Sequence, residues 1–259
     1  MRLVKSILAC LAVAFAMPAS ATTITLDAID YNYSPVYGGI SYVPGGFAAQ
    51  VGPAGQFSFT GHNAATNDPF SALTWCIDIF TDVRGPDYAS GDDLNFNIVS
   101  LADVFDNSAK ISQLSGLVSH AGSVISSAGT LDAQRDAAAA FQLAIWEIIY
   151  EKGTSGYSIS NGDFFTFDDV SPDHHFSQLW DQTDAYLINI ADGGIWSTPI
   201  SSVSILESAT GGNQSQIFAA PAPAVPEPGT WMTMILGFGV AGAMIRRSRK
   251  VVVNAAPAA

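Results

Sequence analysis

Two apolar segments, one near each end of the chain, restrict the part of the sequence that can form a folded domain. Residues 7–17 are apolar and follow Arg2 and Lys5, while residues 229–245 are apolar and carry no charge. The first run is too short to span a membrane, and the second reaches the lower limit for a spanning helix. We therefore expect the folded domain within residues 22–220.

Residues 1–21 have the three parts of a secretory signal peptide. Basic residues come first, the apolar run follows, and Ala19-Ser20-Ala21 supplies the small residues of a cleavage site. Cleavage is predicted between Ala21 and Thr22, so that the exported chain begins at Thr22. A short membrane anchor is the alternative, and the length of the apolar run argues against it.

The C-terminal segment is typical of a linker followed by a membrane helix. Residues 221–228 are rich in proline and predict an extended linker. Residues 229–250 predict a transmembrane helix that ends in a basic cluster, and residues 251–259 form a short tail. Basic residues next to a membrane helix favour the cytoplasmic side, so we expect this end in the cytoplasm. The cluster consists of Arg246, Arg247, Arg249 and Lys250.

The order of these elements resembles the PEP-CTERM sorting signal. Val225-Pro226-Glu227-Pro228 precedes the apolar run, and the basic cluster follows it. The resemblance implies that an exosortase of a Gram-negative bacterium cuts the tail near Pro226-Glu227-Pro228. The protein would then cross the inner membrane through the secretion machinery, remain there transiently, and reach the cell surface or extracellular matrix. The signal names a destination and no activity.

The exported part of the chain is strongly acidic. Residues 22–228 contain four basic and 23 acidic residues, which gives a formal net charge of −19. Such a surface cannot neutralise a row of phosphates, so nucleic acid is excluded as a partner. The sequence lacks a nucleophile elbow, a P-loop and an HExxH motif, and two cysteines exclude a four-cysteine zinc site. We therefore expect no enzyme activity, no cofactor and no metal site.

The hydrophobic pattern predicts an α+β fold, in which a β-rich domain carries an inserted helical region that packs on the sheet. The Gly- and Pro-rich residues 33–55 predict a loop. Thr130 is the expected N-cap of a long helix. Strands are expected over 22–31, 56–61, 73–80, 94–101 and 202–206, and helices over 101–120, 131–152 and 172–191.

Cys76 is the residue for which a chemical role most needs to be considered. Cys10 is removed with the signal peptide, so Cys76 is then the one cysteine of an exported chain and cannot form an internal disulfide. On the predicted strand, Cys76 faces away from the most apolar side, toward whatever covers the sheet.

The helix over 131–152 is expected to cover the side of the sheet that Cys76 faces, because the apolar stripe of this helix contains one amide side chain. Gln142 lies on this stripe with Ala138, Ile145, Trp146 and Ile149. An unpaired buried amide costs roughly 1–3 kcal/mol, so Gln142 needs a partner. The opposite side of this helix carries Asp136, Glu147 and Glu151.

Two short motifs resemble bacterial surface thioester domains. Trp75-Cys76-Ile77 is similar to their aromatic-Cys-apolar motif. The segment from Phe141 to Trp146 is similar to their apolar-Gln-x-x-apolar-Trp motif.

This second resemblance implies an internal thioester between Cys76 and Gln142, formed with loss of ammonia. The domain would then acylate a surface amine or hydroxyl group, or an extracellular polysaccharide, and act as a covalent adhesin in a biofilm. Trp75, Ile145 and Trp146 would support this site, and the stripe of Ile145, Trp146 and Ile149 would shield the thioester from water.

Other interpretations remain open. Cys76 and Gln142 can be an inert buried pair, or Cys76 can form an intermolecular disulfide. The corresponding alternative functions are a non-covalent structural matrix protein and a polysaccharide-active enzyme.

Overall fold

The computed structural model describes residues 22–42, 47–152, 156–167, 176–191 and 193–220. The predicted signal peptide, Pro-rich linker, membrane helix and tail lie outside these ranges, and so do residues 225–228 and the basic cluster. Thr22, the predicted first residue of the exported chain, is also the first residue of β1 and is paired with Ile98. Among the described helices, none combines the length and apolarity needed to cross a membrane.

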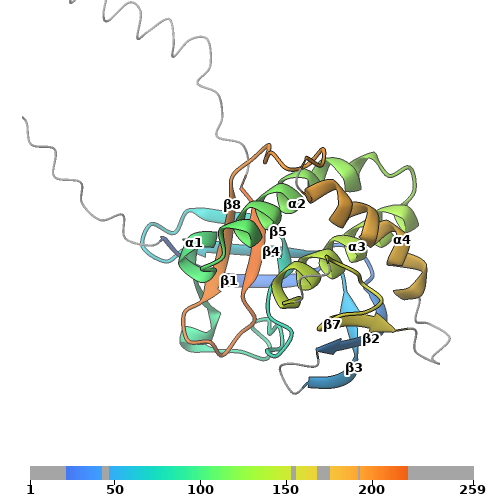
Figure 1. Ribbon diagram of the computed structural model, residues 1–259. Coiled ribbons are helices and arrows are strands. Elements are labelled where there is room, and N and C mark those ends of the chain that lie inside the picture. Colours follow the sequence, from blue (N-terminus) through green and yellow to red (C-terminus); the bar gives the residue numbers. More distant parts are fainter. Residues whose placement is uncertain (1–21, 43–46, 153–155, 168–175, 192, 221–259) are drawn as a thin grey trace, which may run out of the picture.

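Six strands form a closed antiparallel barrel in the order β1-β4-β5-β9-β8-β6 (Figure 1). Closure leaves no unpaired strand edge within the barrel. The β-rich character expected from the sequence is confirmed, whereas the closed barrel was not predicted. The strands are β1 (Thr22–Tyr31), β4 (Phe57–Asn63), β5 (Pro69–Cys76), β6 (Asn95–Ser100), β8 (Val203–Ser208) and β9 (Gln216–Ala219).

A second sheet corrects the prediction that residues 33–55 form a loop. Its order is β3-β2-β7, with strands β2 (Val36–Tyr42), β3 (Phe47–Ala54) and β7 (Phe164–Phe167). The glycines of β2 serve close packing, because a Cβ on Gly38 would collide with the ring of Phe176 and one on Gly39 with the ring of Phe167. Such packing glycines resemble loop glycines in a single sequence.

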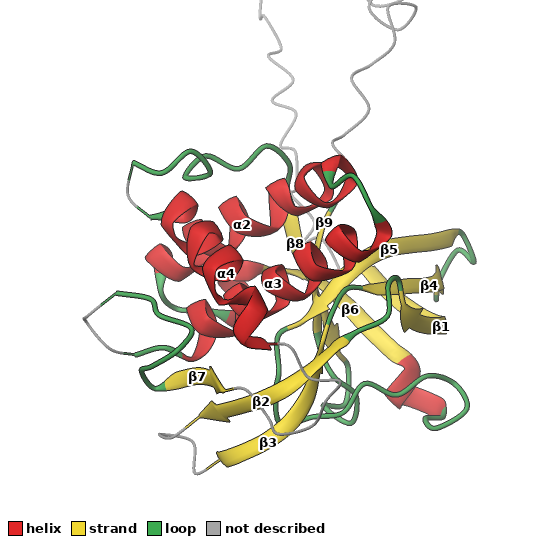
Figure 2. Ribbon diagram, turned by 90° about the vertical axis from the view of Figure 1, so that its right-hand side faces the viewer, coloured by secondary structure: helices red, strands yellow, loops and turns green. Residues whose placement is uncertain are grey.

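The helices gather on one side of the barrel, next to the three-stranded sheet (Figure 2). The Asn107 side chain caps α2, and Thr130 accepts a hydrogen bond from the Ala133 amide and caps α3, as predicted. The helices are α1 (Leu101–Val104), α2 (Ser108–Ser127), α3 (Leu131–Tyr150) and α4 (Phe176–Ile190), and a 3₁₀ turn, η1, covers Gly91–Leu94.

Helix α3 is surrounded on all sides rather than on one face. It contacts α2 and α4 as well as strands of both sheets. Glu147 and Glu151, which lie opposite the apolar stripe, are therefore buried as well. Residues 137–140 are all alanine, which allows neighbouring elements to approach closely.

The strand predicted over 73–80 ends four residues early. β5 stops at Cys76, and the chain then leaves the barrel through a turn in which Asp78 Oδ1 accepts a hydrogen bond from the Phe80 amide. Cys76 is therefore the last residue of its strand, at the point where the barrel meets α3.

Candidate functional site

Cys76 lies in a buried position that disfavours the charged thiolate. Its side chain is 5% exposed, and its Cα is paired with that of Gln216 on β9. Burial, with a smaller contribution from the Asp78 carboxylate, raises the pKa of the thiol to about 12. The sulfur is consequently neutral at physiological pH, which excludes a resting thiolate nucleophile of the kind found in cysteine proteases.

Gln142 contacts the backbone of Cys76 with both ends of its amide. Its Oε1 accepts from the Cys76 amide at 2.9 Å, and its Nε2 donates to the Cys76 carbonyl at 2.8 Å. The structure thus brings these two residues together through the backbone of Cys76, whereas the sequence pattern directed the Cys76 side chain toward Gln142. Gln142 completes the hydrogen bonding of the final residue of β5, and this contact explains an amide on the buried helix.

The sulfur itself faces two other glutamines. Cys76 Sγ lies 2.5 Å from Gln214 Oε1 and 3.5 Å from Gln216 Nε2. Gln214 Nε2 donates to the Asp78 carbonyl, so the whole Gln214 amide is held against the turn that follows Cys76. Neither Gln214 nor Gln216 was predicted as a site residue from the sequence. The available signal was the alternation Gln214-Ser215-Gln216, which places two amides beside the apolar residues of β9.

Asn213 fixes the loop that carries Gln214. Asn213 Oδ1 accepts from the amides of Arg84 and Gln214, each at 2.9 Å. Its Nδ2 donates to the carbonyls of Arg84 at 2.8 Å and Asp93 at 3.2 Å. One buried side chain therefore joins the loop before β9 to the segment around Arg84 and Asp93, which lies 120–129 residues earlier in the chain. These bonds hold Gln214 in place beside Cys76.

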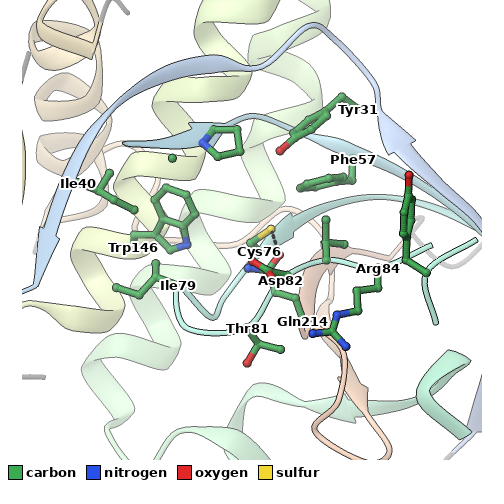
Figure 3. Close-up of a pocket in the computed structure, with 14 residues that line it drawn as sticks. Tyr31, Ile40, Phe57, Cys76, Ile79, Thr81, Asp82, Arg84, Trp146 and Gln214 are labelled. Atoms are coloured by element: carbon green, nitrogen blue, oxygen red, sulfur yellow. Dashed lines mark hydrogen bonds between the residues drawn. The ribbon is translucent and has the colours of Figure 1, made fainter. Parts of the chain in front are cut away.

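A pocket of about 430 Å³ leads from the surface to this site (Figure 3). Cys76 and Gln214 line its inner part, while the stacked rings of Tyr31 and Phe57, 4.3 Å apart, form one wall. Trp146 lines the pocket, and its Nε1 is buried without a hydrogen-bond partner in the described part of the chain. Near the entrance are Asp82, Arg84 and Tyr88.

The residues expected to support a thioester separate into two groups. Trp146 lines the pocket beside Cys76. Trp75 and Ile145 belong to the core between the barrel and the helices, where Trp75 Nε1 donates to the Ala138 carbonyl at 3.3 Å. Only Trp146 of the three is therefore placed to regulate access to the sulfur.

Glu147 is a second buried titratable group, which lies on α3 outside the pocket lining. Its Oε1 accepts from the Ser158 amide at 2.8 Å, whereas its Oε2 has no partner among the described residues. Burial, followed by repulsion from Glu151 and Asp184, raises the pKa of Glu147 to about 8. At neutral pH the folded protein therefore favours a protonated Glu147 carboxyl.

This carboxyl predicts a pH-dependent stability. Unfolding lowers the pKa of Glu147 toward 4.5, so its favourable contribution is complete below about pH 4.5 and is lost as the pH rises through about 8. The free energy of unfolding should fall by up to roughly 1.4 kcal/mol per pH unit in this window. Glu147→Gln should remove this slope, measured as urea unfolding at pH 5, 6.5 and 8. The exposed Glu207→Gln control should keep it, and parallel curves for Glu147→Gln and wild type would contradict the assignment.

In the ranges that the structure covers, no group of three or more His, Cys, Asp or Glu side chains is arranged to hold a metal ion.

Comparison with known proteins identifies the C-terminal segment. Residues 224–250 match the family model of the PEP-CTERM protein-sorting motif, which confirms the predicted sorting signal. The chain therefore carries the signal of an exported protein that is processed by an exosortase at the membrane. No curated protein and no solved structure matches the chain. The thioester-domain resemblance rests on its two short motifs alone.

Proposed function

We propose that this exosortase-sorted protein forms an internal thioester between Cys76 and Gln214 and uses it to attach covalently to an extracellular partner. The observation that carries the proposal is the 2.5 Å separation of Cys76 Sγ and Gln214 Oε1. Because a C=O bond is about 1.23 Å long, the amide carbon of Gln214 lies no more than about 3.7 Å from the sulfur. Reacting atoms in near-attack geometry are about 3–3.5 Å apart.

The proposed reaction is an acyl transfer without oxidation or reduction. The thiol sulfur attacks the side-chain carbon of Gln214, a C–S bond forms, and the C–N bond to the side-chain nitrogen breaks. The thiol proton leaves with that nitrogen as ammonia. A partner nucleophile later attacks the same carbon, displaces the sulfur, and remains joined to Gln214 while Cys76 returns to a thiol.

Gln214 is a better acyl donor than Gln142 on geometric grounds. Both amide atoms of Gln142 hydrogen-bond to the Cys76 backbone, so reaction at Gln142 would break two buried hydrogen bonds. Reaction at Gln214 leaves these two bonds intact and keeps Cys76 in position, and it breaks one hydrogen bond, from Gln214 Nε2 to the Asp78 carbonyl. We therefore propose Gln142 as the residue that holds Cys76 and Gln214 as the residue that it acylates.

The pocket favours an amine as the attacking group. A neutral amine attacks a thioester without help, whereas a hydroxyl group needs a base to remove its proton. The lining contains no histidine, and its carboxylate, Asp82, lies exposed near the entrance. The unpaired Trp146 Nε1 offers a donor to a hydrogen-bond acceptor beside the amine, since buried donors normally have partners.

This chemistry suits a surface adhesin or matrix component rather than an enzyme. Each molecule would consume its thioester once and become joined to its target, so there is no turnover. The strongly acidic exported domain stays soluble and repels anionic polymers. Export and sorting would deliver the intact thioester to the cell surface or matrix, where partners with amines are encountered.

Intact-mass measurement of the mature protein tests the proposal. We expect a mass lower than the sequence mass by one ammonia, and Cys76→Ala should restore the full mass. Methylamine should restore a thiol and leave a methylamide on the glutamine that formed the bond, which peptide mapping locates. A methylamide on Gln214 supports our assignment, and one on Gln142 supports the pair expected from the sequence motifs. A full mass with an alkylatable Cys76 would instead favour a non-covalent matrix protein.

A further inference from the structure

Gln216 presents its amide nitrogen to the reacting atoms from inside the barrel. It is the first residue of β9 and is fully buried. Its Oε1 accepts a hydrogen bond from the Thr74 hydroxyl at 3.1 Å, which directs its Nε2 toward Cys76 and Gln214. Thr74 is also buried. The Gln216 amide is therefore held at its oxygen by Thr74 and at its nitrogen by Cys76 and Gln214.

The nitrogen lies near both atoms that gain negative charge during acyl transfer. Gln216 Nε2 is 3.5 Å from Cys76 Sγ and 3.4 Å from Gln214 Oε1. It also lies 3.4 Å from the Gln214 backbone carbonyl oxygen, which keeps the nitrogen at this end of β9. Attack on the thioester carbon moves charge onto Gln214 Oε1, and collapse of the intermediate moves it onto Sγ. The amide group has two N–H bonds, so it can donate one hydrogen bond to each of these two atoms.

We propose that Gln216 is a catalytic residue for the thioester reaction, donating hydrogen bonds to the oxyanion on Gln214 and to the departing sulfur of Cys76. This inference rests on the proposed function. In the step concerned, the amine nitrogen bonds to the Gln214 carbon, the C–S bond breaks, and its electron pair goes to Sγ. The proton lost by the amine ends on the sulfur, while Gln216 keeps both of its own protons.

Burial makes such a donor necessary. The apolar surroundings that protect a thioester from water also oppose charge on sulfur, as the raised pKa of Cys76 indicates, and the hydrogen bond from Gln216 acts in the opposite direction. Other amides close to the sulfur are already engaged. Gln142 Nε2 donates to the Cys76 carbonyl. Gln214 Nε2 donates to the Asp78 carbonyl before the reaction and leaves as ammonia when the thioester forms, so it supplies no donor to the later step.

The test compares Gln216→Met with wild type in the mature protein. Methionine is unbranched and of similar length and lacks the N–H donors. We expect methylamine incorporation at Gln214 to slow by about 100-fold, the usual loss when one oxyanion donor is removed. Gln56→Met is the matched control, because Gln56 is a similarly buried glutamine just before β4 that accepts a hydrogen bond from Asn32 and lies outside the lining of this pocket. This control should react at the wild-type rate.

Intact mass shows whether the thioester is present, and thermal unfolding shows whether the variant is folded. A folded Gln216→Met variant that no longer forms the thioester also supports the inference, since formation passes through the same oxyanion. An unchanged reaction rate in Gln216→Met, with the mass deficit present, overturns the role of Gln216 and leaves the thioester standing. A wild-type protein without the mass deficit overturns the proposed function and this role with it. If Gln216→Met does not fold, Thr74→Val frees the Gln216 amide to turn, and an unchanged rate in that variant overturns the inference.

Discussion

Cys76→Ser is expected to abolish covalent attachment while leaving the fold intact. Serine occupies nearly the same volume and can donate a hydrogen bond to Gln214 Oε1 as the thiol does. Its hydroxyl is a weak nucleophile without an adjacent base. Wild-type protein should give adducts with amine-bearing partners that survive denaturing electrophoresis, and Cys76→Ser should give none. Adducts formed by Cys76→Ser would show that attachment uses another residue.

The same substitution should also lower stability, because it removes a covalent cross-link. Cys76 and Gln214 are 138 residues apart, and closing a loop of this size stabilises a protein by at most about 5 kcal/mol in the chain-entropy model. Methylamine-treated wild type provides a matched control, since it loses the cross-link and keeps the sequence. Treated wild type and Cys76→Ser should unfold at similar urea concentrations, both below the untreated protein. Equal midpoints for all three samples would indicate that no cross-link was present.

Local sequence patterns predicted the elements that are long and regular. β1 and α3 have the expected starts, and Thr130 caps α3 as its position predicts. A strand of alternating residues and a helix with a side-chain cap carry their signal within ten to twenty neighbouring residues. The pairing of Gln142 with the end of β5 was found for the same reason, because an amide on an apolar helix requires a partner.

Features that depend on distant contacts were not predicted. The burial of Glu147 follows from contacts of α3 with elements on every side, whereas helical periodicity describes one apolar face and one polar face. Gln214 and Gln216 reach Cys76 through the pairing of β5 with β9, a strand of only four residues. No local pattern gives the register of two strands so far apart, so the residues that face the sulfur became visible only in the structure.

Gln142→Leu is expected to cause a large loss of stability. Leucine fits an apolar helix face but leaves the amide and carbonyl of Cys76 buried without their partners. Each unsatisfied group costs about 1–3 kcal/mol, so the loss of both partners should lower the free energy of unfolding by about 2–6 kcal/mol. Gln134→Leu is the matched control on the same helix, because Gln134 is half-buried and makes a single bond to the Ala128 carbonyl. Its effect should stay within about 1 kcal/mol.

The chemical consequence of Gln142→Leu follows from the same contacts. Loss of the two hydrogen bonds lets the end of β5 move relative to Gln214, and a misplacement of about 1 Å can slow a positioned reaction about 100-fold. Gln142→Leu should therefore form the thioester slowly, and the ammonia deficit should increase with incubation time in the folded protein. Full formation at the wild-type rate would show that Gln142 does not position Cys76. If the ammonia deficit never develops in Gln142→Leu, and wild type carries the methylamide on Gln142, then Gln142 is the acyl donor. Gln214 would in that case not form the thioester.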